Sequence, residues 1–243
     1  PKEMGAHFGI LMINVNGKSY EIAKFRKETG VYNSRYPKDI KFVKTIEEDL
    51  ARRDFTINSL AYSKKTGIID LYGGRQDIRR KVIRFVGKPK LRIEEDALRI
   101  LRAFRFISKL GFNLDKKTAE AICKKRKFLT KISKERIFDE LSKILMGKFV
   151  KKAFIEMKKL RVLEMIIPEF YYAYNFDQNN PNHPDDLFNH IIKVIHLCDY
   201  DLVTRFAALF HDLGKINVKI IDAKGIFYFY GHEKESALIA EEE

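Results

Sequence analysis

The chain has 243 residues, 45% of them hydrophobic and 12% aromatic, so it is long enough to bury one large core or two smaller ones and is not a disordered chain. No uncharged apolar run reaches about 18 residues, and the first residues lack a basic-then-apolar signal pattern, which argues against a membrane span and against secretion. The two cysteines, Cys123 and Cys198, form no C-x-x-C pair. We therefore expect a reducing, cytoplasmic location.

The net charge of +14 is concentrated in the middle of the chain. Residues 79–161 contain 27 Lys and Arg against nine Asp and Glu, whereas the rest of the chain is slightly acidic. A basic module of this kind suits a polyanionic partner, because contacts to phosphates release condensed counterions. The alternative is a lysine-rich surface that only contacts solvent.

The first 80 residues have the pattern of a mixed α and β region. Residues 8–25 read as a β-hairpin around Asn16 and Gly17, and "IKFV" at 40–43 reads as a further strand. Residues 46–62 favour a helix. The segment "GIIDLYGG", residues 67–74, favours a short strand that ends in a glycine turn.

Beyond residue 90 apolar residues recur at three- and four-residue spacing, which predicts helices almost throughout. The helix in "DALRILRAFRFISKLGF" should end at Gly111 as a C-cap. Residues 168–186 are rich in Asn, Pro and Asp and make the best domain boundary. A second helical region follows from "LFNHIIKVIHL".

The segment "EEDLARRDFTINSLAY" places two arginines beside several acids. An arginine fork binds phosphate oxygens in pairs, and an adjacent carboxylate can hold that fork in place. The alternative is a helix end whose arginines pair with a local acid, namely Glu47, Glu48 or Asp49. This segment alone supports the two interpretations equally.

Two later segments repeat the pairing of acids with arginines. In "EEDALRILRAFRF", Asp96 and Arg99 are three residues apart, so on one helix they would share a face and could match the edge of a base. In "SKERIFDEL", Arg136 and Glu140 have i,i+4 spacing and Ser133 is a helix N-cap candidate. The alternative in each case is an ordinary ion pair on a solvated helix.

Taken in this order, the segments resemble the class II tRNA nucleotidyltransferase and bacterial poly(A) polymerase family. The matching strings are "RRDFTINSLAY", "DLYGGRQDI", "RIEEDALRILRAFRF" and "ISKERIFDEL", within residues 5–170. The resemblance implies an α/β head that transfers nucleotides from CTP or ATP to the tRNA 3′ acceptor end. It also implies helical neck and body segments that bind the base and the tRNA.

The resemblance also implies roles for individual residues. Ribose and triphosphate contacts fall on Arg53, Asp54 and Asn58, base selection falls on Asp96 and Arg99, and Arg102 assists at the phosphates or the base. Arg136 and Glu140 fall in the motif that steadies the neck helices. Glu21 lies near the strand that supports the catalytic metal site. The motif that links head to neck contains residues with a structural role, namely Asp70, Gly73, Gly74 and Asp77.

One part of the family pattern is missing from this sequence. The family uses an Asp-x-Asp pair that holds two Mg²⁺ ions for phosphoryl transfer, and residues 1–20 contain no aspartate. We expect the protein to extend further at its N-terminus. An intact mass of 28.5 kDa would instead mean that these carboxylates are truly absent.

The C-terminal region contains a set of potential metal ligands. His190 precedes the adjacent pair His211 and Asp212, and His232 follows them. Imidazole and carboxylate groups suit a divalent ion, and Lys215 is placed to meet a phosphate. A lone helical histidine is usually structural, and His183 and His196 are read in that way. The set resembles the HD-domain phosphohydrolases over about residues 183–243, although the last aspartate of that family is not in the sequence.

The sequence therefore predicts an α+β chain: a nucleotidyltransferase-type α/β head at 1–80, an all-α neck and body at 81–168, and a helical HD domain at 183–243. The predicted function is template-independent addition of C, A or both to tRNA 3′ ends, with Mg²⁺ for transfer, a divalent metal at the HD site and no membrane partner. Two alternatives stay open. One is a metal-dependent phosphohydrolase on an RNA-binding platform, and the other is a catalytically incomplete tRNA-binding module.

Overall fold

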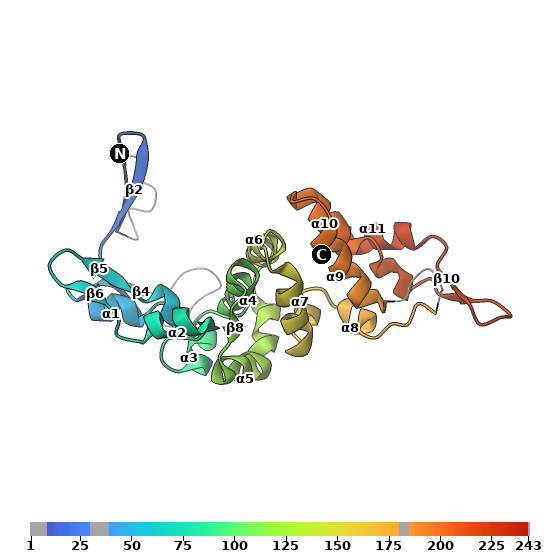
Figure 1. Ribbon diagram of the computed structural model, residues 1–243, viewed down its shortest axis with the longest axis horizontal. Coiled ribbons are helices and arrows are strands. Elements are labelled where there is room, and N and C mark those ends of the chain that lie inside the picture. Colours follow the sequence, from blue (N-terminus) through green and yellow to red (C-terminus); the bar gives the residue numbers. More distant parts are fainter. Residues whose placement is uncertain (1–8, 30–38, 180–184, 243) are drawn as a thin grey trace. The chain divides into compact units, whose positions relative to one another are not determined.

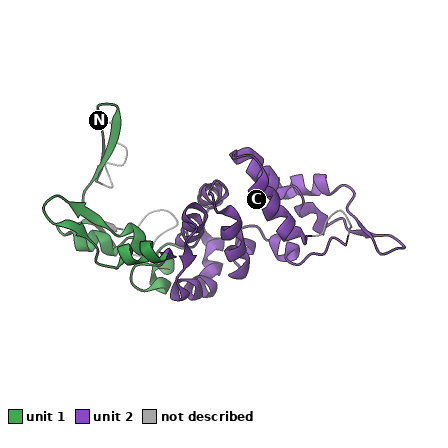
Figure 2. Ribbon diagram, viewed as in Figure 1, with its two compact units in different colours: residues 1–80, 84–96 green, residues 81–83, 97–243 purple. Residues whose placement is uncertain are grey.

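The computed structural model describes residues 9–29, 39–179 and 185–242. The chain divides into two compact units, one made of residues 1–80 and 84–96 and the other of residues 81–83 and 97–243 (Figure 2). The predicted limit after residue 80 lies close to this division, whereas the predicted boundary at 168–186 lies within the second unit. The domain limits at 81–168 and 183–243 stay a prediction.

The first unit combines short antiparallel strand pairs with short helices. β1 pairs with β2, β3 with β4, and β5 with β6. Its elements, most of which are labelled in Figure 1, are β1 (Ile10–Val15), β2 (Lys18–Ala23), β3 (Arg26–Thr29), β4 (Asp39–Phe42), α1 (Ile46–Ala51), the 3₁₀ turn η2 (Thr56–Asn58), β5 (Ala61–Ser63), β6 (Gly67–Ile69), α2 (Gly74–Arg80) and α3 (Pro89–Glu95).

The strands predicted in this unit are confirmed. Asn16 and Gly17 connect β1 to β2 with φ angles of 51° and 75°, the left-handed conformation that a tight hairpin of this type requires. β4 contains most of the predicted strand at 40–43, and β6 begins the segment 67–74.

The helix predicted over 46–62 is correct only in its first third. α1 ends at Ala51, and the chain then forms η2 and β5. The Asp54 side chain accepts a hydrogen bond from the Phe55 amide at 2.8 Å, which competes with helical bonding. Phe55 is fully buried, forms a strand-like bridge to Phe85 and stacks on its ring at 4.9 Å. Burial of Phe55 therefore overrides the local helical pattern.

The second unit is mostly helical. At the beginning of this unit, β7 pairs in parallel with β8, the strand that follows α4 in the chain. Its elements are β7 (Val82–Ile83), α4 (Arg99–Leu110), β8 (Asn113–Leu114), α5 (Lys116–Lys125), η3 (Arg126–Lys131), α6 (Lys134–Leu145), α7 (Val150–Lys159), η4 (Leu163–Met165), α8 (Phe170–Ala173), α9 (Leu187–Leu197), α10 (Leu202–Phe210), η5 (Leu213–Ile216), β9 (Ile220–Ile221), β10 (Phe227–Tyr228) and α11 (His232–Glu242).

The predicted helices and the predicted C-cap are confirmed in this unit. α4 ends at Gly111, which has a φ of 70° and donates its amide to the Ile107 carbonyl at 2.8 Å. α4 packs against α6 and α7 and buries Ile100, Phe104 and Ile107 completely. α9 packs against α7 and α10, and η5 packs against α11. These contacts place the first turn of α11 beside the end of α10.

Both cysteines of the chain are free thiols in the structure. Within the described residues, no helix has the length and hydropathy that a bilayer span requires.

Candidate nucleotide-binding and metal-binding sites

Asp49 is the centre of the arginine cluster in the first unit. Its Oδ1 accepts hydrogen bonds from Arg52 Nη2 at 2.7 Å and Arg52 Nε at 3.0 Å, and its Oδ2 accepts from Arg53 Nη2 at 3.2 Å. The backbone amide of Arg26 in β3 also donates to Oδ1, at 3.3 Å. Three acids were candidates for pairing with these arginines, and Asp49 carries both pairs.

Burial and charge act in opposite directions on Asp49. Its side chain is 5% exposed, and burial acts to raise the pKa of the carboxyl. Hydrogen bonds and charge from Arg52, with further bonds from the Arg26 amide and Arg53, outweigh burial and hold the pKa of Asp49 below its usual range. Asp49 is therefore a buried, ionised group that fixes two arginines.

The structure brings Arg53, Asp54 and Asn58 together. Arg53 Nη1 donates to the Asn58 carbonyl at 2.9 Å, and Asn58 Nδ2 donates to Asp54 Oδ1 at 3.2 Å. Asp54 is buried, whereas the Arg53 side chain is 39% exposed. The three residues predicted to contact ribose and triphosphate thus form one linked cluster, in which the arginine is accessible.

The segment "DLYGGRQDI" forms the start of α2, which contacts the turn η2 that contains Asn58. The Asp70 carboxylate accepts the amides of Gly74 and Arg75 at 2.7 and 2.9 Å, so it satisfies amide groups in the first turn of α2. Asp77 of α2 accepts Thr56 Oγ1 at 2.5 Å and Arg84 Nε at 2.9 Å. The contact between Asp77 and Thr56 connects α2 to η2.

The predicted arrangement of Asp96 and Arg99 on one helix is wrong. α3 ends at Glu95, Asp96 is its extended C-cap residue with φ −151° and ψ 106°, and α4 begins at Arg99. Aspartate is a weak helix former that favours caps and turns, and the break at Asp96 agrees with this preference. Asp96 belongs to the first unit, whereas Arg99 belongs to the second and is 6% exposed. Arg102 lies three residues after Arg99 on α4.

Arg136 and Glu140 both lie on α6, as their spacing predicted. Glu140 is buried, and its Oε1 accepts Arg105 Nη1 of α4 at 3.0 Å and Lys143 Nζ at 3.2 Å. The sequence did not single out Arg105, which connects α4 to α6. Glu21 lies in β2 opposite Met12 and is exposed.

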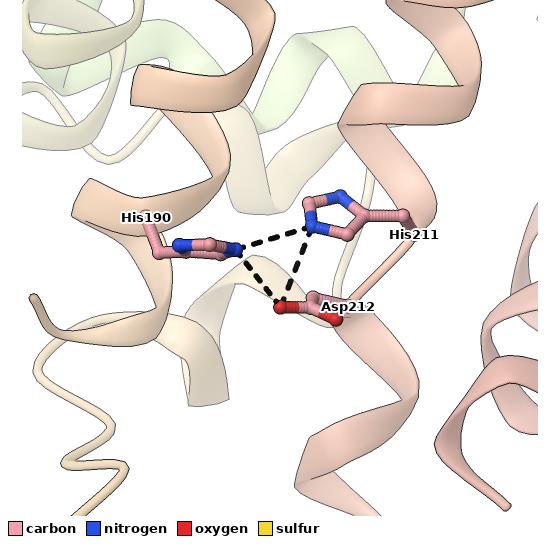
Figure 3. Close-up of side chains that lie close together, drawn as sticks. All are labelled: His190, His211 and Asp212. Carbon is pink, nitrogen blue, oxygen red and sulfur yellow. Dashed lines mark hydrogen bonds and ion pairs between the residues drawn. The ribbon is translucent and has the colours of Figure 1, made fainter. Parts of the chain in front are cut away.

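The histidines of the second unit converge on Asp212, and Figure 3 shows two of them, His190 and His211. His190 of α9 and His211 at the end of α10 place their Nε2 atoms 3.2 and 3.4 Å from Asp212 Oδ2 and 3.3 Å from each other. Ligand atoms of these three residues all lie within 4.8 Å of one another, which is close enough to surround one ion. His232 approaches the other carboxylate oxygen, Oδ1, at 3.3 Å.

Lys215 adds a positive charge to this cluster. Its ammonium lies 2.7 Å from Asp212 Oδ2, is almost fully buried and donates to Gln178 Oε1 at 2.9 Å. Burial acts to raise the pKa of Asp212, but hydrogen bonds from His190, His211 and Lys215 outweigh it and hold that pKa far below its usual range. Gln178, which the sequence did not single out, therefore positions the lysine.

Asp212 also affects the neighbouring imidazole. Burial acts to lower the pKa of His211, but the hydrogen bond and the charge of Asp212 outweigh it and raise that pKa above its usual value. The His211 Nδ1 lies 2.8 Å from the Ala208 carbonyl, and a proton on Nδ1 would direct Nε2 toward the cluster.

Two family models match this chain. The model described as the poly A polymerase head domain matches residues 2–84, and the model described as a probable RNA and SrmB-binding site of polymerase A matches residues 111–173. These segments correspond to most of the first unit and to the basic helices of the second.

Curated relatives and solved structures point to the same family. The chain is 41% identical over 170 residues to the CCA-adding enzyme of Bacillus subtilis, covering 70% of this chain and 43% of that protein. It is 39% identical over 206 residues to that of Lactobacillus helveticus, covering 82% and 51%. The chain thus spans about half the length of the curated relatives it matches.

Two solved structures extend the similarity to the fold. A crystal structure of the Bacillus stearothermophilus CCA-adding enzyme in complex with CTP matches with a TM-score of 0.60 at 28% identity, covering 86% of this chain and 63% of that one. A tRNA nucleotidyltransferase complexed with a primer tRNA and an incoming ATP analog matches with a TM-score of 0.57 at 26% identity, covering 79% and 58%. The chain belongs to the class II tRNA nucleotidyltransferase and poly(A) polymerase family.

Proposed function

We propose that this chain carries the nucleotide-binding and tRNA-binding parts of an enzyme that adds C, A or both to the tRNA 3′ end from CTP and ATP. The observation that carries the proposal is the linked cluster of Arg53, Asp54 and Asn58, in which a buried Asp49 fixes an accessible guanidinium. Such a fork suits phosphate oxygens. The named CCA-adding relatives support the same activity.

Each predicted residue has a role in this proposal. Arg53 binds the triphosphate, and Asp54 with Asn58 holds the ribose side of the nucleotide. Asp96 and Arg99 are the residues proposed to select the base, and Arg102 assists on the same helix as Arg99. Glu140 and Arg136 hold the neck helices, with Glu140 linked to Arg105.

Magnesium would supply the charge stabilisation that phosphoryl transfer needs in this family. Residues 1–20 contain no aspartate and Glu21 alone is not a two-metal site, so the residues present do not fit this group. The proposal therefore assigns this chain the binding and orientation of nucleotide and tRNA, and assigns none of its residues a metal-dependent step.

The role of Arg99 is tested by Arg99→Ala and Arg99→Lys in protein translated from the complete open reading frame. We expect the preference between CTP and ATP to fall by about tenfold, because a paired base contact of this kind gives about 1–3 kcal/mol of discrimination. The dissociation constant for tRNA should stay within twofold. Lys109→Ala, an exposed change on the same helix, is the control. A collapse of tRNA affinity with unchanged nucleotide preference would contradict this role.

A second function is supported by the cluster around Asp212. We propose a divalent metal held by His190, His211 and Asp212, with His232 as a further ligand and Lys215 facing a phosphate group. These donors fit a metal that activates water for hydrolysis of a phosphate ester. The proposed activity is that of an HD-type phosphohydrolase.

Metal content tests this second function. Titration of the chain with Mn²⁺ should show binding that His211→Ala weakens by at least tenfold, because one of three converging ligands is lost. His196→Ala, an exposed histidine of α9, should bind like the unsubstituted chain. Hydrolysis of a 2′,3′-cyclic phosphate to the phosphate monoester should require the same residues. Equal Mn²⁺ affinity of both variants would contradict the proposed metal site and would leave the cluster with a structural role.

A further inference from the structure

The carboxylate of Asp49 uses its two oxygens for different purposes. Oδ1 accepts Arg52 and the amide of Arg26, which connects the end of α1 to β3. Oδ2 accepts Arg53 Nη2 at 3.2 Å. The buried Asp49 carboxylate thus connects α1 to β3 and also fixes the accessible guanidinium of Arg53.

The two arginines differ in what else they contact. Arg52 Nε also donates to the Arg26 carbonyl at 3.0 Å, and its side chain is 22% exposed. Arg53 donates instead to the Asn58 carbonyl, within the cluster proposed to bind nucleotide, and its side chain is 39% exposed. Arg52 therefore connects elements of the fold, whereas Arg53 presents its guanidinium to the outside.

We propose that Asp49 is a positioning residue for nucleotide binding, which acts by fixing the Arg53 guanidinium in the direction of the triphosphate. The inference rests on the proposed function, and it goes further because it separates the residue that touches the phosphate from the one that holds it. An arginine without a fixed partner loses side-chain freedom when it binds phosphate. The Asp49 carboxylate removes part of that loss before the nucleotide arrives.

The chemistry of position 49 is specific to a carboxylate. An asparagine has one acceptor oxygen, and its NH₂ group would face guanidinium N–H donors, so Asp49→Asn keeps the shape but loses one of the two arginine contacts. Asp49→Glu keeps the charge but moves the carboxylate by one methylene. Asp49→Asn should therefore hold Arg53 less firmly, and Asp49→Glu should hold it in a different position.

The test is equilibrium binding of CTP to the 243-residue chain. We expect Asp49→Asn to raise the dissociation constant for CTP about tenfold, the loss that accompanies removal of a charge-assisted hydrogen bond. Glu47→Gln, an exposed change on the same helix, should leave it within twofold. The double variant Asp49→Asn with Arg53→Ala should bind no more weakly than Arg53→Ala alone, because Asp49 acts through Arg53.

Several outcomes separate this inference from the proposed function. Normal CTP binding by Asp49→Asn together with weak binding by Arg53→Ala would overturn the inference alone, as would fully additive losses in the double variant. If Asp49→Asn fails to fold, Asp49→Glu should fold and weaken CTP binding at least threefold, and normal binding by that variant would overturn the inference. A chain that binds no CTP at all would overturn the proposed function and this inference with it.

Discussion

Two buried carboxylates, Asp49 and Asp212, organise the candidate sites in similar ways. A buried charge is costly unless it is paired and hydrogen-bonded. Asp49 is surrounded by two guanidinium groups, and Asp212 by imidazoles and the ammonium of Lys215. In both cases the acid fixes groups that suit a phosphate or a metal, so the pairing that stabilises the carboxylate also prepares the site.

Acid should destabilise the chain in part through Asp49. Its pKa is depressed in the folded state, so its contribution to stability is present above its unfolded pKa of about 3.9 and is lost as the pH falls through the folded value. Asp49→Asn should lower the free energy of unfolding at pH 7 and show a shallower loss between pH 5 and pH 2. Urea unfolding between pH 2 and pH 7 measures the free energy of unfolding of both proteins. If the free energy of unfolding fell equally with pH for Asp49→Asn and the unsubstituted chain, the predicted contribution of Asp49 would be wrong.

Sequence spacing predicted contacts between residues close in the chain and missed those between distant ones. Asp49 lies in α1 and reaches Arg52 and Arg53, three and four residues later, where the helix ends. The sequence left open which neighbouring acid pairs with the arginines and whether they pair with an acid or bind phosphate. The pairs Arg105–Glu140 and Lys215–Gln178 join residues 35 and 37 positions apart. No local pattern encodes such a pair, because tertiary packing brings its members together.

At the scale of elements, the breaks in the helices matter most. The helical pattern predicted α4, α6 and α9 and the C-cap at Gly111, because each has a continuous apolar face. The same pattern runs through residues 89–110 and concealed the break at Asp96. It also concealed the end of α1, where burial of Phe55 decides the conformation. The spacing of apolar residues therefore predicts where helices form but does not predict where they are interrupted.

The contact between α2 and η2 depends on Gly74. A Cβ at this position would lie 2.2 Å from the Thr56 carbonyl oxygen and 3.2 Å from a methyl group of Leu60. Gly74→Ala must therefore move α2 away from the turn that carries Asn58, and should destabilise the chain by about 1–3 kcal/mol.

Urea unfolding measures the effect of Gly74→Ala, and Gln76→Ala, an exposed change on α2, serves as the control. We expect the control to stay within about 0.5 kcal/mol of the unsubstituted chain. Equal stability for both variants would mean that the close approach of α2 to η2 does not constrain the fold.

For the whole molecule, the distribution of charge agrees with the proposed partner. Residues 79–161 contain 27 Lys and Arg against nine Asp and Glu, and they include α4, α5, α6 and α7 of the second unit. The family model described as a probable RNA and SrmB-binding site covers residues 111–173, which overlap this basic region. The basic residues proposed to contact tRNA lie mostly in the helical unit, whereas the arginine cluster proposed to bind the nucleotide lies in the first unit.

Incorporation of labelled nucleotides into tRNA tests the proposed function most directly. Protein translated from the complete open reading frame would be mixed with Mg²⁺ and with tRNA transcripts that end before the first C, after C or after CC, and CTP and ATP would be offered separately. We predict addition of C, of A or of both to at least one transcript, and loss of that addition in Arg53→Ala. Absence of incorporation on all three transcripts would contradict the account and leave the metal cluster around Asp212 as the main candidate for activity.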